Sequence, residues 1–135
     1  MKTILITGGC GFIGSSLVRR VVSDKLYKVI NVDKLTYAGN LDSLDSIKES
    51  DNYIFEKIDI CDFKAIKNIF SKYKPDYVMH LAAESHVDRS ILDSDAFINT
   101  NIIGTYNLLK CAYEFIASPD FNNKSFRFHH ISTDE

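Results

Sequence analysis

Short apolar runs, rich in β-branched and aromatic residues, recur along the chain between turn-forming residues. Such runs predict strands. The first run is continuous and closed by glycines, which favours a strand buried on both faces. The predicted strands are Thr3–Thr7, Lys28–Asp33, Tyr53–Ile60, Tyr77–Ala83 and Ser125–Ser132.

Between these runs, apolar positions recur every three or four residues, the spacing of one helix face. They predict a helix from Phe12, a second helix capped by Asp62, and a long helix from Asp95 to Ala117. The region 40–51 has weaker helical patterning and could be largely loop. The predicted faces are Ile13, Leu17 and Val21; then Phe63, Ile66, Ile69, Phe70 and Tyr73; then Ile98, Ile102, Leu109, Ala112 and Ile116.

The resulting alternation of strands and helices predicts an α/β fold, a doubly wound parallel sheet with helices on both faces. A length of 135 residues favours one domain, or part of a larger one. The formal net charge is -2 with both signs scattered, which argues against nucleic acid and membrane surfaces as partners. No apolar run approaches the ~20 residues of a membrane-spanning helix.

The cysteines Cys10, Cys61 and Cys111 are widely spaced and include no Cys-x-x-Cys pair. They indicate reduced thiols in a cytoplasmic protein rather than a disulfide framework or a zinc site. The adjacent histidines His129 and His130 would point to opposite faces of a strand and so cannot share a metal ion. The sequence therefore predicts no metal site.

The segment "TGGCGFIG" lies between the first predicted strand and the first predicted helix, with glycines at Gly8, Gly11 and Gly14. Glycines here permit a tight turn, a close approach of a pyrophosphate and close helix–strand packing. Asp33 ends the second strand, where a carboxylate can accept hydrogen bonds from the adenosine ribose. It would repel the 2′-phosphate of NADP, although Lys34 could soften that repulsion. A Rossmann-type NAD site is therefore predicted.

Other candidate residues follow the third and fourth predicted strands. Asp59 is a candidate partner for the adenine amino group, and a helix cap is the alternative. In "LAAESHVDRS", the small Ala82 and Ala83 suit a backbone that passes close to a cofactor. Ser85 is favoured for substrate contact, whereas Glu84 and other polar side chains of this loop could simply be solvated.

Two further clusters of polar residues need explanation. The segment "NTNIIGT" places Asn99, Thr100, Asn101 and Gly104 inside the long helix, where they are unfavourable. They indicate either a function or a packing contact, in which Asn101 bonds a neighbouring loop and Gly104 admits a bulky side chain. The chain ends on Thr133, Asp134 and Glu135, and adjacent acids can divide general-acid and general-base roles if their pKa values differ. A solvated loop is the alternative.

Together, "TGGCGFIG", "VDKLTYAGNL", "DICD", "HLAAESHVDRS", "TNIIGTYNLL" and "FHHISTDE" resemble the extended short-chain dehydrogenase/reductase family, and within it the nucleotide-hexose 4,6-dehydratases. The resemblance covers Met1 to Glu135. It implies that NAD takes a hydride from C4 of a hexose on a nucleoside diphosphate (dTDP-glucose), that water leaves across C5 and C6, and that the hydride returns to C6. One small departure is Cys10, where the family has alanine.

The resemblance also implies residue roles. Asp134 is the acid that protonates the departing C6 hydroxyl, Glu135 the base that takes the C5 proton, and Thr133 a partner of the C4 oxygen. Ser85 and Thr133 contact the sugar. The implied NAD contacts are Gly8, Gly11, Phe12, Ile13, Gly14, Asp33, Lys34, Leu35, Thr36, Asp59, Ile60, Leu81, Ala82, Ala83, Ser85 and Thr100.

The family's Tyr-x-x-x-Lys pair, which oxidises C4, and its nucleotide-sugar subdomain lie beyond the fifth strand. We expect that no Tyr-x-x-x-Lys spacing is present in this chain. Residues 1–135 are therefore expected to lack the pair and to be the amino-terminal part of a Rossmann domain, with about five strands, incomplete at its C-terminus. Alone, it should hold NAD without turnover. The resemblance further implies a homodimer formed through the long helix when the protein is full length.

Two alternatives remain open. The chain could act only by binding, holding NAD or pairing with a longer relative through its long helix. An exposed last strand without later elements argues against this alternative. The full-length protein could instead be a sugar-nucleotide 4-epimerase or a decarboxylase of the same family.

Overall fold

The computed structural model describes residues 1–133, which form one five-stranded parallel sheet with the strand order β3-β2-β1-β4-β5. The strands are β1 (Lys2–Thr7), β2 (Tyr27–Asp33), β3 (Tyr53–Lys57), β4 (Tyr77–His80) and β5 (Arg127–His130). The predicted doubly wound α/β fold is confirmed. β3, β4 and β5 end two or three residues before their predicted ends, because the chain leaves the ladder there to line a cavity. The order reverses direction between β1 and β4, where such sheets bind ligands.

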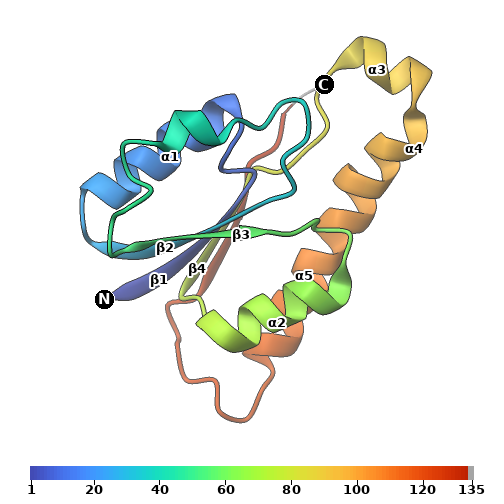
Figure 1. The fold of residues 1–135 in the computed structure, drawn as a ribbon. Coiled ribbons are helices and arrows are strands. Elements are labelled where there is room, and N and C mark those ends of the chain that lie inside the picture. The colour runs from blue at the N-terminus through green and yellow to red at the C-terminus, as the bar shows by residue number, and fades with distance from the viewer. Residues whose placement is uncertain (134–135) are drawn as a thin grey trace.

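Helices cover both faces of this sheet (Figure 1). α1 lies on one face, and α2 and α5 lie side by side on the other. The helical segments are α1 (Phe12–Ser23), the 3₁₀ helix η1 (Leu41–Leu44), α2 (Phe63–Tyr73), α3 (Val87–Leu92), α4 (Ser94–Phe97), the π-helix η2 (Ile98–Gly104) and α5 (Thr105–Ile116). The segment 87–92, expected to be loop, is thus helical. No helix within residues 1–133 is long and apolar enough to cross a membrane.

The sheet separates two apolar cores, because alternate residues of each strand face opposite sides. In β1, Ile4 and Ile6 pack with α1 and η1, whereas Leu5 packs with α2 and α5. The predicted face of α1 differs from the observed one by one position. Val18 and Val22 are its buried apolar side chains, the predicted Leu17 and Val21 pack against the same core but are only half-buried, and the predicted Ile13 is 68% exposed. Gly14 packs directly against the backbone of the glycine loop, and this contact sets the rotation of α1 about its own axis. Phe12 and Ile13 therefore point toward the cavity described below.

The helices of the second core show one prediction confirmed and one wrong. Asp62 caps α2 by accepting a hydrogen bond from the Ala65 N–H at 2.9 Å, an interaction that contributes about 1 kcal/mol. The predicted face of the long helix is wrong except at Ala112, because the helix contains a π-helical turn that shifts the phase of the residues around it. The residues that it buries are Thr100, Gly104, Asn107, Leu108, Cys111 and Ala112.

A buried histidine joins the long helix to the centre of the sheet. His80 is 2% exposed, its Nδ1 lies 2.7 Å from the Thr7 hydroxyl oxygen, and its Nε2 lies 2.9 Å from that of Thr105. The Thr7 oxygen also accepts the Ala82 N–H at 3.3 Å, so its own hydrogen is available to Nδ1. Neutral His80 then donates from Nε2 to Thr105. The chain of bonds connects α5, β4 and β1 at the carboxyl edge of the sheet.

We expect the free energy of unfolding to fall as the pH is lowered from about 6.5 to about 4. Burial, with a smaller effect of neighbouring His130, lowers the pKa of His80 from 6.5 to about 4. Between these values the unfolded chain binds a proton that the folded chain does not bind. The stability from this group is therefore complete above the unfolded pKa and decreases on acidification, by roughly 3 kcal/mol.

Urea unfolding near neutral pH and at about pH 4.5 measures this loss. His80→Gln, which keeps one donor and one acceptor, should show a smaller decrease than the wild type, whereas the exposed His86→Gln should match the wild type. An equal decrease in all three proteins would contradict the assignment.

Candidate functional site

The glycine loop between β1 and α1 is held by backbone contacts that leave no room for side chains. Gly8 has a φ of 73°, and a Cβ on it would lie 2.6 Å from the Ala82 backbone nitrogen. A Cβ on Gly14 would lie 2.0 Å from the Gly8 carbonyl oxygen. The ends of β1 and β4 and the start of α1 therefore meet through bare backbone. This contact places the N-terminus of α1 against the switch point of the sheet.

Asp33, at the end of β2, fixes the two loops beside it. Its Oδ2 accepts the Cys10 N–H at 2.9 Å, and its Oδ1 accepts the Leu35 N–H at 2.8 Å. Leu35 has a φ of 58°, and its side chain packs into the core below α1. One carboxylate thus links the glycine loop to the chain that follows β2. It still has lone pairs for hydroxyl donors, since a carboxylate offers about four acceptor positions.

Lys34 crosses the site toward the long helix. Its Nζ lies 3.3 Å from the Thr100 hydroxyl oxygen and 3.7 Å from Asp59 Oδ2. Asp59 also accepts the Cys61 N–H at 2.9 Å, as an acid in a turn does. Lys34 and Thr100 are therefore in direct contact on one wall of the cavity, and Asp59 lies close to the same ammonium group.

The long helix supports the opposite wall. Asn101 Oδ1 accepts the Glu84 N–H at 2.8 Å, and its Nδ2 donates to the Glu84 carbonyl at 2.9 Å. A Cβ on Gly104 would lie 2.5 Å from Ile60 Cδ1. The packing explanation of these helix-disfavouring residues is confirmed for Asn101 and Gly104. They position two segments that line the cavity, so the contacts also serve the site.

These elements enclose a cavity of about 560 Å³ at the carboxyl ends of the strands. Most residues expected at the NAD site line it, as does Thr133. The expected residues present are Gly8, Gly11, Phe12, Ile13, Gly14, Asp33, Lys34, Thr36, Ile60, Leu81, Ala82, Ala83, Ser85 and Thr100. Leu35 and Asp59 do not line it, because Leu35 is turned into the core and Asp59 is held behind Lys34. Asp134 and Glu135 lie outside the described residues.

The cavity also has lining residues that were not expected from the sequence. They are Val32, Ala38, Gly39, Ile58, Glu84, Ile131 and Ser132. Val32, Ile58 and Ile131 lie at the ends of strands or just after them, so their position at the carboxyl edge of the sheet could have identified them as lining residues. Ala38 and Gly39 lie in a polar loop whose path no periodic pattern predicts.

The expectation that no Tyr-x-x-x-Lys spacing is present is wrong. Tyr53 and Lys57 have this spacing on β3, and Tyr106 and Lys110 have it on α5. Neither tyrosine lines the cavity. Burial raises the pKa of Tyr53, which accepts a hydrogen bond from Asn31, so this phenol stays protonated at neutral pH and is not available as a base. Neither pair is therefore placed to oxidise a ligand in the cavity.

The cysteines are free thiols. Burial raises the pKa of Cys10 to about 12 and the pKa values of Cys61 and Cys111 to about 11, so none is a thiolate at neutral pH. Within residues 1–133, no group of three or more His, Cys, Asp and Glu side chains could hold a metal ion. The chemistry that the described part of the cavity offers is hydrogen bonding by hydroxyls, by the carboxylates of Asp33 and Glu84 and by the ammonium group of Lys34.

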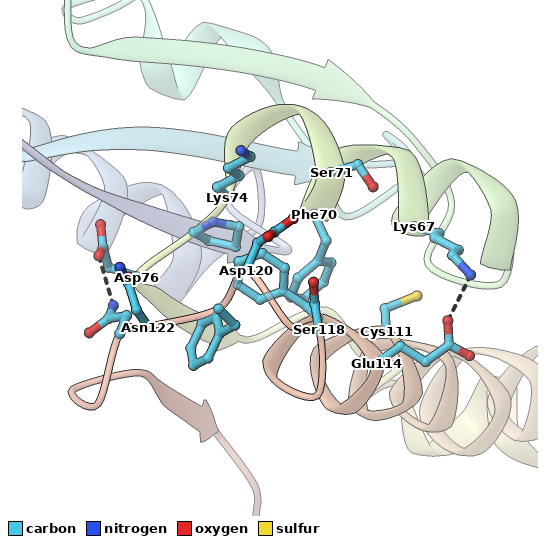
Figure 2. Close-up of a pocket in the computed structure, with 14 residues that line it drawn as sticks. Lys67, Phe70, Ser71, Lys74, Asp76, Cys111, Glu114, Ser118, Asp120 and Asn122 are labelled. Carbon is cyan, nitrogen blue, oxygen red and sulfur yellow. Dashed lines mark hydrogen bonds and ion pairs between the residues drawn. The ribbon is translucent and has the colours of Figure 1, made fainter.

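A second cavity, of about 510 Å³, lies between α2, α5 and the segment 118–123 (Figure 2). Two of its charged groups pair with each other, with Lys67 Nζ 2.8 Å from Glu114 Oε2. Asn123 donates to Asp76 at 2.8 Å, and Phe70 lies in its apolar wall. This cavity is near the start of β4, at the end of the sheet opposite to the glycine loop. No expected site residue contributes to it.

Comparisons with known proteins agree with this geometry. A dTDP-glucose 4,6-dehydratase of Shigella flexneri is 59% identical over 133 residues, which are 98% of this chain and 37% of that protein. The crystal structure of dTDP-glucose 4,6-dehydratase from Bacillus anthracis in complex with NAD has a TM-score of 0.82 and 32% identity, over 99% of this chain and 38% of that chain. The crystal structure of UDP-glucose 4-epimerase from Thermotoga maritima with UDP-glucose has a TM-score of 0.75 and 37% identity, over 84% of this chain and 34% of that chain.

The chain thus spans well under half the length of these relatives. The family profile described as GDP-mannose 4,6 dehydratase matches residues 5–135, which is nearly the whole sequence. The chain therefore belongs to the GDP-mannose 4,6-dehydratase family.

Proposed function

We propose that the cavity at the carboxyl ends of the strands binds NAD. The observation that carries this proposal is the glycine loop. A Cβ on Gly11 would meet only the Gly8 carbonyl oxygen, at 3.5 Å, so the space above Gly11 is open to a pyrophosphate. Gly11 also provides no side-chain cap for α1, which leaves the first N–H groups and the positive end of the helix dipole for the phosphates. The Bacillus anthracis relative was crystallised with NAD.

The proposed contacts follow from the walls of the cavity. Asp33 accepts hydrogen bonds from the adenosine ribose, and its charge disfavours the 2′-phosphate of NADP. Lys34 and Thr100 flank the adenosine, and Asp59 reaches the adenine amino group if Lys34 moves aside. The remaining proposed NAD contacts are Gly8, Gly11, Phe12, Ile13, Gly14, Leu35, Thr36, Ile60, Leu81, Ala82, Ala83 and Ser85.

For a protein that joins this chain to the remaining length of its relatives, we propose dehydration of dTDP-glucose to a 4-keto-6-deoxy sugar. Bound NAD accepts the C4 hydride and later returns it to C6. Ser85 and Thr133 hold the sugar, and Thr133 hydrogen-bonds its C4 oxygen. Asp134 protonates the departing C6 hydroxyl, and Glu135 takes the C5 proton. This proposal is supported by the 59% identity to the Shigella flexneri dehydratase and by Ser85 and Thr133 lining one cavity.

For residues 1–135 alone, we propose NAD binding without turnover. Within the described residues, no tyrosine lines the cavity that would hold NAD, so no phenol is placed to take the C4 hydroxyl proton. The three free thiols support a cytoplasmic location.

We also propose a homodimer formed through the long helix. α5 buries one face against α2, yet its other face carries large apolar side chains. Leu109 is 48% exposed, Tyr113 69% and Tyr106 57%. An exposed apolar stripe of this kind marks a protein–protein interface when it is contiguous. A second copy of the same helix would cover it symmetrically.

Gly11→Ala should weaken NAD binding at least about tenfold while the chain remains folded. The φ of Gly11 is -76°, which alanine adopts freely, so the only new atom projects into the space proposed for the pyrophosphate. Calorimetric titration with NAD and NADP measures affinity and cofactor preference, and urea unfolding measures stability.

Gly14→Ala serves as the contrasting variant, since its Cβ would meet the Gly8 carbonyl within the fold and unfolding should therefore become easier. Unchanged NAD affinity in the stable Gly11→Ala variant would sink the assignment of the site.

In a chimera that carries residues 1–135 on the remainder of the Shigella flexneri relative, Glu135→Gln should reduce formation of the 4-keto-6-deoxy product at least about 100-fold. Oxidation of C4 precedes the loss of the C5 proton, so absorbance of enzyme-bound NADH should still develop with dTDP-glucose. The exposed Glu49→Gln is the control and should turn over normally.

Normal turnover by the Glu135→Gln chimera would exclude Glu135 as the base. Formation of an epimer by the unsubstituted chimera, without any 4-keto-6-deoxy product, would favour a 4-epimerase instead.

In the same chimera, Leu109→Glu together with Tyr113→Glu should convert dimers into monomers, because two charges would be buried without partners. Sedimentation measures the change. Lys110→Glu, at a neighbouring position of the same helix, is the control and should remain dimeric. A doubly substituted chimera that still sediments as a dimer would show that the dimer interface does not include this face of α5.

A further inference from the structure

One aromatic side chain bridges the two loops that flank the NAD cavity. Tyr37 lies in the loop after β2, and Arg89 lies in α3, which follows β4. The guanidinium carbon of Arg89 is 3.5 Å from the centroid of the Tyr37 ring. The Tyr37 hydroxyl donates to Glu84 Oε2 at 3.3 Å. His86 lies against the same ring, with centroids 6.0 Å apart.

These contacts join two segments that line the cavity, residues 36–39 and residues 84–85, and we infer that the gap between these segments is the mouth of the cavity. Thr36, Ala38 and Gly39 line one side of the cavity, and Glu84 and Ser85 line the other. Tyr37 is not among the lining residues, and it is 50% exposed. Its ring therefore lies outside the mouth and joins the two sides, rather than contacting what the cavity holds.

Each side of the mouth is fixed at its base. The Asn40 N–H donates to the Cys10 carbonyl at 3.0 Å, and the Gly39 N–H donates to the Thr36 carbonyl at 2.9 Å. Glu84 is held through both of its backbone groups by Asn101. α3 differs, because none of its residues is buried. A helix with so few buried contacts opens at low cost in free energy, so the side chain of Arg89 can leave Tyr37 without disturbing the core.

We propose that Tyr37, Glu84 and Arg89 form a clasp that must open each time NAD enters or leaves the cavity. The inference rests on the proposed NAD site and adds a positioning role to it. Tyr37 and Arg89 do not line the cavity, so the contact between them does not depend on what the cavity holds. Closing it therefore stabilises the empty and the occupied protein alike, and it slows exchange without changing affinity, since only differential interactions shift an equilibrium. Such retention suits a reaction in which the hydride taken from C4 returns to the same sugar.

The test is stopped-flow measurement of NAD association and dissociation for the 135-residue chain. Tyr37→Leu and Arg89→Gln should each raise both rates by roughly threefold to tenfold, the range of an exposed cation–π contact plus one hydrogen bond. The dissociation constant should change less than about twofold. The double variant should exchange NAD no faster than Tyr37→Leu, because Arg89→Gln removes only the cation–π contact that Tyr37→Leu has already removed. Tyr37→Phe, which keeps the ring on Arg89, should have a smaller effect.

Arg20→Gln is the matched control, because Arg20 pairs with Asp24 on the exposed side of α1, and its rates should equal those of the wild type. Hydrogen exchange of α3 amides in the NAD-free chain gives a second readout, and it should accelerate in Tyr37→Leu. Wild-type rates in both single variants overturn the clasp alone. A weaker affinity with an unchanged association rate also overturns it, since it indicates direct contact with NAD. A wild-type chain that binds no NAD overturns the proposed function and the clasp together.

Discussion

The contact between the backbones of Gly8 and Ala82 is the constraint on which the site depends. β1 and β4 are paired up to Thr7 and His80, and the two chains then continue so close together that a Cβ on Gly8 would lie 2.6 Å from the next backbone. The start of α1 can reach the switch point only because Gly14 also lacks a side chain. The N-terminus of α1, the end of a helix that favours anions, is thereby brought against the carboxyl edge of the sheet, where Asp33 delivers its carboxylate.

The wall opposite this contact is built by the part of the sequence that is least suited to a regular helix. The π-helix η2 (Ile98–Gly104) places Asn101 on the loop after β4 and lets Gly104 lie against Ile60. Thr105 then reaches His80, whose other nitrogen faces Thr7 beside the glycine loop. The local cost of the irregular turn is offset by hydrogen bonds to groups that would otherwise be buried unpaired. The same contacts therefore pack the long helix against the sheet and build this wall of the site.

Strand alternation, the glycine loop and the capped helix α2 could be predicted because each depends on local residue order. The faces of α1 and α5 could not, because both helices have two overlapping apolar stripes. Val18 and Val22 are buried in α1 only because Gly14 fixes its rotation, and Leu108 is buried in α5 after a π-turn that no 3.6-residue pattern reveals. Within the site, the direction of the Leu35 side chain could not be predicted, because the positive φ of Leu35 turns that side chain into the core.

The two sides of the cavity also differ in how firmly they are held, and this difference suits a cofactor that must stay through a cycle. Asp33 and Asn101 fix the inner walls through backbone groups, so the geometry presented to NAD is preorganised. The outer contact between Tyr37 and Arg89 involves only exposed side chains, and it can break without unfolding either wall. In the proposed NAD site, the rigid inner walls set the affinity, whereas the separate exposed contact sets the rate of exchange. The proposed clasp can therefore lengthen the time that NAD stays bound without making binding so tight that the empty protein never refills.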